Sequence, residues 1–280
     1  MNEPEGLQAL AQFAARHRRL FVLTGAGCST ESGIPDYRDT RGDWKRPPPV
    51  TYQAFTGDDA TRRRYWARSL IGWRTMGGAR PGAAHLALAR LESAGRVSLL
   101  LTQNVDGLHG AAGSQAVVDL HGRIDTVRCL GCEARSPRVA LQAELLRRNP
   151  AWAALDARAA PDGDADLDGL DFSSFDVPDC PVCGGMLKPD VVFFGENVPR
   201  DRVAAAREAL AASDGMLIVG SSLMVYSGFR FAQAAAEAGI PIAALNRGVT
   251  RADSLYALKV EQPIGATLDA LARLLEPQAA

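Results

Sequence analysis

Four short apolar runs stand out along the chain because each is nearly continuous instead of alternating with polar residues. They occupy residues 20–23, 97–101, 216–219 and 240–245. Continuous runs of this length are typical of parallel strands that are buried on both faces of a sheet. Apolar residues at helical spacing, at 202–212 and 229–238, supply the crossover helices that a parallel sheet requires. The pattern predicts an α/β fold with a doubly wound parallel sheet.

A polar or glycine-rich cluster follows each apolar run directly. The four clusters lie at 24–27, 102–106, 220–222 and 246–248. In open α/β sheets, ligands bind in the crevice beyond the carboxyl ends of the strands. We therefore expect the four clusters to line one shared crevice.

Residues 7–20 form a further periodic stretch. Its apolar residues at helical spacing are Leu7, Leu10, Ala11, Ala14 and Ala15. They predict an amphipathic helix that packs on the rest of the protein. No apolar run approaches the roughly 18 residues that a membrane span needs, and Glu3 and Glu5 precede the first basic cluster. We expect no signal or transit peptide, no membrane partner and a cytoplasmic location.

Composition and charge are those of an ordinary globular protein. The 280 residues include 31 basic and 32 acidic side chains, for a net charge of -1, and 47% are apolar. Nucleic-acid binding driven by a basic field is therefore not expected. A chain of this length fits one large α/β domain or a large domain with a smaller partner, and we expect two lobes. We assign 1–36, 95–121 and 186–280 to the sheet domain, and 37–94 (a helical part) and 122–185 to a smaller lobe.

Four of the five cysteines form two Cys-x-x-Cys pairs. The pairs are Cys129 with Cys132 and Cys180 with Cys183. Without an export signal this pattern favours a metal over disulfides, and four thiolates complete a closed tetrahedral zinc site. The segment 122–185 is then the zinc-binding part of the smaller lobe, with a redox role of each pair as the alternative. Cys28, the fifth cysteine, is predicted to be a small buried apolar residue.

The first polar cluster contains Gly25 and Gly27, which would let a pyrophosphate approach the backbone. The sixth position of the dinucleotide-binding fingerprint is Thr30 rather than glycine, and no acidic residue closes a second strand roughly 20 residues further on. A hydride-transfer dehydrogenase is therefore disfavoured.

Longer strings surround these clusters. They are GAGCSTESGIPDYR at 25–38, TQNVDGLH at 102–109, LHG at 120–122, KPDVVFFGE at 188–196 and GSSL at 220–223. Their content and order, together with the two cysteine pairs, resemble the sirtuin family of NAD-dependent protein-lysine deacylases. The resemblance implies a Rossmann-like sheet, NAD as a consumed co-substrate and one structural zinc ion.

The resemblance also implies which residues bind NAD. The implied set is Gly25, Ala26, Gly27, Glu31, Asp36, Tyr37, Arg38, Gln103, Asn104, Val105, Asp106, Gly220, Ser221, Ser222, Asn246, Arg247, Gly248 and Ile264. The segment 36–38 would fold over the nicotinamide end, and Tyr37 stands where many relatives have Phe. The residues at 103–106 would line the nicotinamide and ribose pocket, while 221–222 and 246–248 would hold the adenosine half.

His121, within the LHG string, is the candidate general base. Its unperturbed pKa of about 6.5 lets a neutral imidazole accept a proton from a ribose hydroxyl. Asn104 and Asp106 are predicted to share in catalysis. His85 and His109 also lie in family-like strings, and we interpret them as structural packing or hydrogen-bonding residues.

The implied reaction removes an acyl group from a protein lysine and yields nicotinamide and O-acyl-ADP-ribose. The acylated peptide is expected to add as a strand between the loops at 192–196 and 223–228. The predicted substrate contacts there are Val192, Phe193, Gly195 and Glu196. A protein mono-ADP-ribosyltransferase that uses the same NAD site is the alternative enzyme, and an NAD-sensing binding module is the non-enzyme alternative.

The acyl group itself stays open. Tyr65 and Arg68 match a Tyr-x-x-Arg that another sirtuin branch uses to bind acyl chains ending in a carboxylate. A surface arginine beside a core aromatic is the alternative interpretation. The segments at 64–68, 160–164 and 225–228 more closely resemble the class II branch, which is associated with ADP-ribosyl transfer and with removal of lipoyl and branched acidic acyl groups. The oligomeric state is left open as well.

Overall fold

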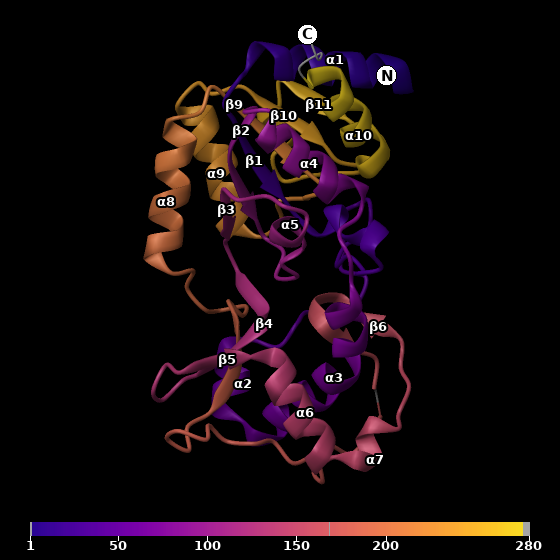
Figure 1. Ribbon diagram of the computed structural model, residues 1–280, viewed down its shortest axis with the longest axis vertical. Coiled ribbons are helices and arrows are strands. Elements are labelled where there is room, and N and C mark those ends of the chain that lie inside the picture. The colour runs from indigo at the N-terminus through magenta and orange to yellow at the C-terminus, as the bar shows by residue number, and fades with distance from the viewer. Residues whose placement is uncertain (1, 168, 277–280) are drawn as a thin grey trace.

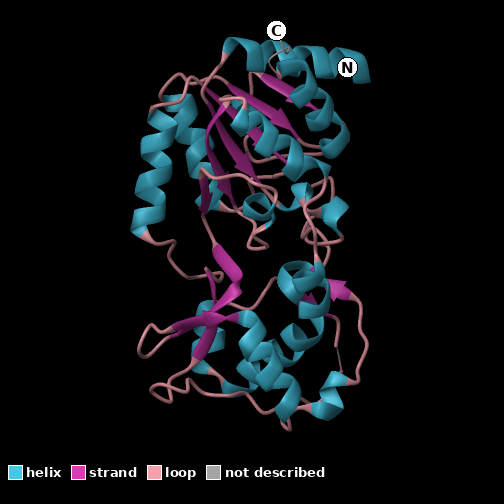
Figure 2. Cartoon of the chain, in the orientation of Figure 1, coloured by secondary structure: helices cyan, strands magenta, loops and turns pink. Residues whose placement is uncertain are grey.

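The computed structural model describes residues 2–167 and 169–276, which fold into two lobes. Figure 1 shows the lobes stacked along the long axis, with both chain ends at the larger one. The larger lobe holds a sheet flanked by helices, and the smaller lobe is mostly helical with a short sheet (Figure 2). The predicted α/β fold with a second lobe is confirmed. Within the described ranges, no helix is long and apolar enough to span a membrane.

The larger lobe is built on a six-stranded parallel sheet. Its strands are β1 (Leu20–Thr24), β2 (Val97–Thr102), β3 (Val117–Asp119), β9 (Gly215–Val219), β10 (Ile242–Leu245) and β11 (Leu258–Val260). They lie in the order β11-β10-β9-β1-β2-β3, with every neighbouring pair parallel. Counted along the chain this is the 3-2-1-4-5-6 order of dinucleotide-binding sheets, which reverses between β1 and β9. The four predicted strands are confirmed, while β3 and β11 are too short to stand out as apolar runs.

Helices cover both faces of this sheet, which explains why its strands are apolar throughout. The helices are α1 (Glu3–Arg16), α4 (Ala83–Ser93) and α10 (Ile264–Leu275) on one face, and α8 (Arg200–Ala211) and α9 (Tyr226–Glu237) on the other. Leu20 and Val22 of β1 enter the first core, and Phe21 and Leu23 enter the second. Alternate side chains of one strand therefore face different cores. Both faces of the strand are buried, so neither is a polar face.

The N-terminal helix begins earlier than its apolar spacing predicts. Helix α1 starts at Glu3 because Asn2 and Glu5 form a capping box. Asn2 Oδ1 accepts from Glu5 N at 3.0 Å, and Glu5 Oε2 accepts from Asn2 N at 3.1 Å. The helix ends at Arg16, and Leu20, the last residue of the predicted helix, is the first residue of β1.

The strand predicted at 240–245 begins two residues later, at Ile242. Gly239, with φ of +69°, turns the chain at the end of α9, and Ile240 N donates to the carbonyl oxygen of Ala235 at 2.9 Å. Pro241 has no N–H for the sheet. The helix end and the proline together shorten the strand.

The smaller lobe combines helices with a three-stranded antiparallel sheet. Its helices are α2 (Tyr52–Gly57), α3 (Asp59–Gly78), α6 (Arg138–Arg148) and α7 (Pro150–Ala153). Its sheet has the order β5-β4-β8, from β5 (Arg135–Pro137), β4 (Gly122–Cys129) and β8 (Leu187–Val191), and β6 (Ala159–Ala160) pairs with β7 (Asp164–Ala165). Phe55, Trp66 and Phe175 are buried in the core of this lobe.

Two elements belong to a different lobe from the one that the sequence assigns to them. Helix α4 falls within the helical segment 37–94, but Ala84 and Leu88 pack in a core of the large sheet. Strand β8 falls within 186–280, but it pairs with β4 in the smaller lobe. The chain therefore returns to the large sheet before α4, and it leaves the smaller lobe only after β8.

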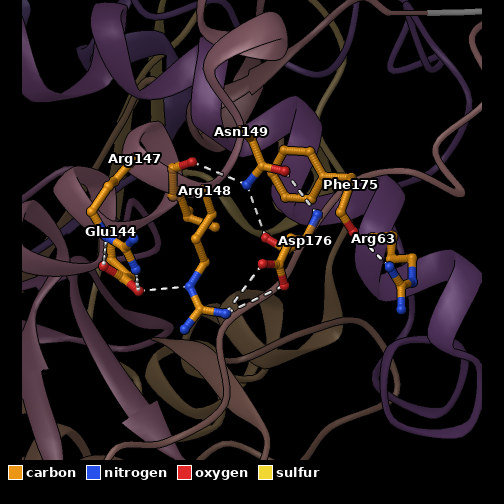
Figure 3. A network of polar contacts seen from close by, with 8 residues as sticks. Arg63, Glu144, Arg147, Arg148, Asn149, Phe175 and Asp176 are labelled. Atoms are coloured by element: carbon orange, nitrogen blue, oxygen red, sulfur yellow. Dashed lines mark hydrogen bonds and ion pairs between the residues drawn. The ribbon is translucent and has the colours of Figure 1, made fainter.

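A polar network fastens the segment that leads to the second cysteine pair (Figure 3). Asn149 Nδ2 donates to the carbonyl oxygen of Asp176 at 2.9 Å, and Asn149 Oδ1 accepts from Asp176 N at 2.8 Å. Arg63 of α3 donates to the carbonyl oxygen of Phe175 at 2.7 Å. Asn149 is buried, and its amide supplies partners to partly buried backbone groups of Asp176. The network holds this segment in place shortly before Cys180.

Candidate active site

A cavity of about 670 Å³ opens at the carboxyl ends of four strands of the large sheet. The residues that directly follow β1, β2, β9 and β10 all line it: Gly25, Gln103, Gly220 and Asn246. The loop at 192–196, which follows β8 of the smaller lobe, lines it as well. The shared crevice that the polar clusters predict is therefore confirmed.

The cavity collects nearly all the residues that the sequence assigns to NAD. Those that line it are Gly25, Ala26, Gly27, Glu31, Asp36, Tyr37, Arg38, Gln103, Asn104, Val105, Asp106, Gly220, Ser221, Ser222, Asn246, Arg247 and Ile264. Gly248 is not among the lining residues, and its N–H donates to Glu261 Oε1 at 2.8 Å. The predicted base and peptide contacts also line the cavity: His121, Val192, Phe193, Gly195 and Glu196.

Two glycine turns meet where the strand order reverses, between β1 and β9. Gly27 N donates to the carbonyl oxygen of Gly220 at 2.9 Å. A Cβ on Gly27 would lie 2.9 Å from Gly220 Cα, and Gly220 itself has φ of +60°. Both positions therefore require glycine. The chain continues into two short 3₁₀ turns, Ala26–Cys28 and Thr30–Ser32, rather than into the long helix of the dehydrogenase fingerprint.

His121 lies between β3 and β4 and is held at both ring nitrogens. Its Nδ1 lies 2.9 Å from the carbonyl oxygen of Gln103, and its Nε2 lies 2.7 Å from Ser227 Oγ. A carbonyl only accepts, so Nδ1 carries the proton of the neutral ring and Nε2 is the acceptor. Burial lowers the pKa of His121 to about 4, and the charges of Arg230 and Arg202 act in the same direction. At pH 7 the cavity therefore contains a neutral imidazole.

Asn104 and Asp106 are joined through the hydroxyl of Ser29. Ser29 Oγ donates to Asp106 Oδ2 at 2.6 Å and accepts from Asn104 Nδ2 at 3.0 Å. His85 Nε2 lies 3.3 Å from Ser29 Oγ. Because His85 Nδ1 accepts from Gly82 N at 3.1 Å, Nε2 is the donor to Ser29. Ser29 therefore fixes two residues that line the cavity, and the prediction of His85 as a hydrogen-bonding residue is confirmed.

Aromatic contacts connect the segment after these turns with the loop at 192–196. The guanidinium carbon of Arg38 lies 3.8 Å from the ring centroid of Trp44. The ring centroid of Trp44 lies 6.0 Å from that of Tyr37 and 5.8 Å from that of Phe194. All four side chains belong to residues that line the cavity, so Trp44 bridges the predicted NAD segment and the predicted peptide loop.

The four paired cysteines gather at one point in the smaller lobe. Their Sγ atoms all lie within 4.8 Å of one another, with 3.5 Å between Cys129 and Cys183 and 3.8 Å between Cys132 and Cys180. A tetrahedral zinc ion with Zn–S bonds of about 2.3 Å separates its sulfur atoms by about 3.8 Å. Zinc therefore fits the cluster. None of these cysteines lines the cavity, and four thiolates leave no open position on the ion for chemistry.

Comparison with known proteins agrees with this geometry. The Sir2 family model matches residues 25–227. The chain belongs to the Sir2 family. It is 67% identical over 269 residues to an NAD-dependent protein deacetylase of Xanthomonas campestris pv. campestris (strain 8004), which covers 96% of this chain and 91% of that protein.

Two further Sir2 family comparisons cover almost the whole chain. NAD-dependent protein deacetylase 2 of Bradyrhizobium diazoefficiens is 66% identical over 267 residues, which is 95% of this chain and 98% of that protein. A solved structure of a Sir2 variant with a deacetylated p53 peptide and 3′-O-acetyl ADP-ribose has a TM-score of 0.76 at 27% identity. It covers 95% of this chain and 97% of that chain.

In this Sir2 family chain, the loop at 192–196 is tied to elements on both sides. Its first N–H donates to the carbonyl oxygen of His121 at 2.7 Å. Lys188, which is 2% exposed, donates to Glu196 Oε2 at 3.1 Å, and the same oxygen accepts from Phe193 N at 2.9 Å. Burial lowers the pKa of Lys188, and the charge of Glu196 opposes that shift. The carboxylate of Glu196 therefore holds the loop.

Tyr65 and Arg68 lie on α3 and are not among the residues that line the cavity. The ring of Tyr65 packs against those of Phe55 and Phe193, with 5.3 Å between centroids in each case, and burial raises its pKa. Arg68 donates to both carboxylate oxygens of Asp164, at 2.8 Å and 2.9 Å. Tyr65 is therefore connected to the cavity only indirectly, through Phe193.

Sequence reasoning missed several residues that shape this Sir2 family site. Ser29, Lys188 and Ser227 lie inside family-like strings, which are the signal that could have identified them. Trp44 has no local signal, because its position depends on Phe194 far along the chain. Cys28 is 1% exposed and burial raises the pKa of its thiol, so its prediction as a buried residue is confirmed.

Proposed function

We propose that the chain is an NAD-dependent protein-lysine deacetylase that produces nicotinamide and O-acetyl-ADP-ribose. The observation that carries the proposal is the position of His121, which shares one cavity with the glycine turns between β1 and β9 and has its Nδ1 on the carbonyl oxygen of Gln103. The Xanthomonas and Bradyrhizobium relatives bear the name NAD-dependent protein deacetylase. The related Sir2 structure contains a deacetylated p53 peptide and 3′-O-acetyl ADP-ribose.

NAD suits the chemistry of the lining residues. The glycines at 25, 27 and 220 leave the backbone bare, so that a pyrophosphate would bind to main-chain N–H groups. Ser221, Ser222 and Asn246 would hold the adenosine half, and Tyr37 with Arg38 would cover the nicotinamide end. Bound NAD supplies an activated ribose carbon, C1′, from which nicotinamide leaves when the acetyl-lysine oxygen attacks.

The residues of the chain orient the reactants and move one proton. Asn104 and Asp106, held by Ser29, would fix the nicotinamide ribose and exclude water from it. His121 would then accept a proton from a ribose hydroxyl, because its imidazole is neutral and Nε2 is its acceptor. A positioned general base of this kind contributes typically about 10² to 10⁴ in rate.

The peptide would bind between the loops at 192–196 and 223–228, parts of both of which line the cavity. An extended peptide adds to such edges through main-chain hydrogen bonds. Its acetyl-lysine side chain would then enter the cavity beside Phe193, toward His121. Zinc would act at a distance, because it stabilises the smaller lobe from which the first of these loops extends.

At a finer level, we place the chain in the class II branch, which the segments at 64–68, 160–164 and 225–228 resemble. Acetyl-lysine is the primary substrate of the proposal. An acidic acyl chain is the second candidate, with Tyr65 and Arg68 as its binding residues. Arg68 already binds a carboxylate, that of Asp164, so an acidic acyl group would have to replace Asp164 in the same role.

In the decisive experiment, the chain is incubated with NAD and an acetyl-lysine peptide. Mass spectrometry then follows nicotinamide, the deacetylated peptide and O-acetyl-ADP-ribose. We expect all three products in equal amounts, none without the peptide, and loss of peptide deacetylation in His121→Ala. Transfer of labelled ADP-ribose to protein without deacetylation would identify a mono-ADP-ribosyltransferase instead. NAD binding without turnover of any acyl peptide would identify a binding module.

A further inference from the structure

We propose that Ser227 relays the proton from the ribose hydroxyl to His121. The proposal rests on the proposed function, because it takes His121 as the general base. Ser227 Oγ lies 2.7 Å from His121 Nε2, and both residues line the cavity. Ser227 belongs to the first turn of α9, an element far from His121 in the sequence.

The hydrogen bonds of His121 determine the direction of this contact. A neutral imidazole carries a single N–H, and the carbonyl oxygen of Gln103 fixes that proton on Nδ1. Nε2 then has one lone pair and no hydrogen, so the hydroxyl of Ser227 is the donor in the 2.7 Å contact. The basic lone pair of His121 is therefore already occupied by Ser227. Any other hydroxyl in the cavity reaches this base through Ser227 or by displacing it.

The helix turn that carries Ser227 packs on Gln103, which also holds His121, and this favours the relay over displacement. The carbonyl oxygen of Ser227 accepts from Arg230 Nε at 3.1 Å. At the next residue, a Cβ on Gly228 would lie 2.4 Å from Gln103 Oε1, so the first turn of α9 packs directly on Gln103. Gln103 also binds His121 Nδ1 through its carbonyl oxygen. Rotating the Ser227 hydroxyl away from His121 would break a partly buried hydrogen bond. It would leave the contact with Arg230 and the packing on Gln103 unchanged.

The relay consists of two coupled proton transfers. The ribose hydroxyl gives its proton to Ser227 Oγ while Ser227 gives its own proton to His121 Nε2. Ser227 ends as it began, and His121 becomes an imidazolium. The electron pair freed on the ribose oxygen forms the bond to the acyl carbon, whose double bond to the lysine nitrogen becomes a single bond as its π electrons move onto that nitrogen. Nicotinamide departure precedes this step and transfers no proton to His121, so it does not need Ser227.

The first test measures the ligand-free chain. Nitrogen-15 spectra of labelled histidine report whether Nε2 of His121 accepts a hydrogen bond, with His121→Ala to assign the signal. We expect a hydrogen-bonded acceptor nitrogen in the unaltered chain, its loss in Ser227→Ala and its return in Ser227→Thr, which keeps the hydroxyl. An unchanged signal in Ser227→Ala would overturn the contact on which the relay depends.

The second test separates the two steps of the reaction. Exchange of labelled nicotinamide into NAD reports the first step, and peptide deacetylation reports both. In Ser227→Ala we expect deacetylation to fall about tenfold or more with exchange within about twofold, while Ser227→Thr restores deacetylation. The solvent isotope effect on deacetylation should indicate two protons in flight in the unaltered chain.

The possible failures are distinguishable. If the unaltered chain does not deacetylate peptides, or if His121→Ala does so at full rate, the proposed function itself fails. If the unaltered chain is active and His121→Ala is not, yet Ser227→Ala deacetylates within twofold of the unaltered rate, the relay alone is wrong. Equal loss of exchange and deacetylation in Ser227→Ala also overturns the relay, because a proton relay acts after nicotinamide has left.

Discussion

Lys188 and Glu196 form an ion pair of 3.1 Å at the base of the loop that carries the predicted peptide contacts. The side chain of Lys188 is 3% exposed, and it also donates to two backbone carbonyl oxygens of its own strand, those of Pro189 and Val191. Glu196 Oε2 in turn accepts from Phe193 N at 2.9 Å. The pair therefore sets the conformation of the loop from within the protein, although Glu196 also lines the cavity.

Replacing this ammonium should disturb the loop. In Lys188→Met, Glu196 keeps a partly buried charge without its partner, and removal of one member of a buried pair costs about 3–5 kcal/mol. We expect a lower free energy of unfolding by chemical denaturation and a several-fold higher KM for the acetylated peptide, with little change in NAD affinity. Arg147→Met, which removes an exposed partner of Glu144, is the control and should leave both measurements near the unaltered values. A peptide KM that stays unchanged would argue against a positioning role of the pair.

Stability should fall as the pH drops below about 6.5. Burial lowers the pKa of His109 to about 3 and that of His121 to about 4, whereas the unfolded chain has histidine pKa values of about 6.5. Between these values the unfolded chain binds more protons, so the stabilisation is complete above about pH 6.5 and is lost as the pH falls toward 4. Each group contributes a slope of about 1.4 kcal/mol per pH unit.

Denaturant unfolding at several pH values from 7.5 to 5 measures this slope. His109 Nε2 lies 2.9 Å from Thr24 Oγ1, which itself donates to Thr102, so His109 is the donor there. His109→Gln keeps a donor but cannot titrate, and it should show a shallower pH dependence than the unaltered chain. Equal slopes in the two proteins would mean that His109 is not buried in its neutral form.

The cysteine cluster should bind one zinc ion for each chain. We expect Cys132→Ser to lose the metal and to lower the melting temperature, because zinc binding energy is folding energy for the smaller lobe. Metal analysis and thermal unfolding measure the two effects. Cys28→Ala, which alters a cysteine outside the cluster, should retain the metal. Full zinc content in Cys132→Ser would show that the four thiolates are not the ligands.

The contact between Arg68 and Asp164 predicts how the acyl preference responds to mutation. Asp164→Asn weakens the ion pair that joins β7 to Arg68. If Arg68 binds acidic acyl chains, this variant should remove a glutaryl group several-fold faster relative to an acetyl group than the unaltered chain does. Asp166→Asn is the matched control, because it removes the carboxylate directly after β7, which pairs with Arg46 instead of Arg68. An unchanged ratio of the two rates would assign Arg68 a structural role in its ion pair with Asp164.

Local patterns predicted the features that depend on neighbours in the sequence. The apolar runs at 20–23, 97–101 and 216–219 match strands closely, because burial on both faces leaves no position for a polar residue. The strand predicted at 240–245 was wrong at its start, since the end of α9 and Pro241 outweighed the apolar pattern. In the site, the polar clusters after these strands converge because parallel strands end at one edge.

The sequence by itself determined the doubly wound sheet, the family, the four thiolates and His121, since each is encoded in a contiguous run or a short spacing. Only the tertiary structure decided that Ser29 joins Asn104 to Asp106 and that Ser227 contacts His121. It also decided that Tyr65 is partly buried and packs against Phe55 and Phe193. The physical reason is that a side chain's partner depends on which elements pack together and in what register. That arrangement follows from burial summed over the whole chain rather than from any local pattern.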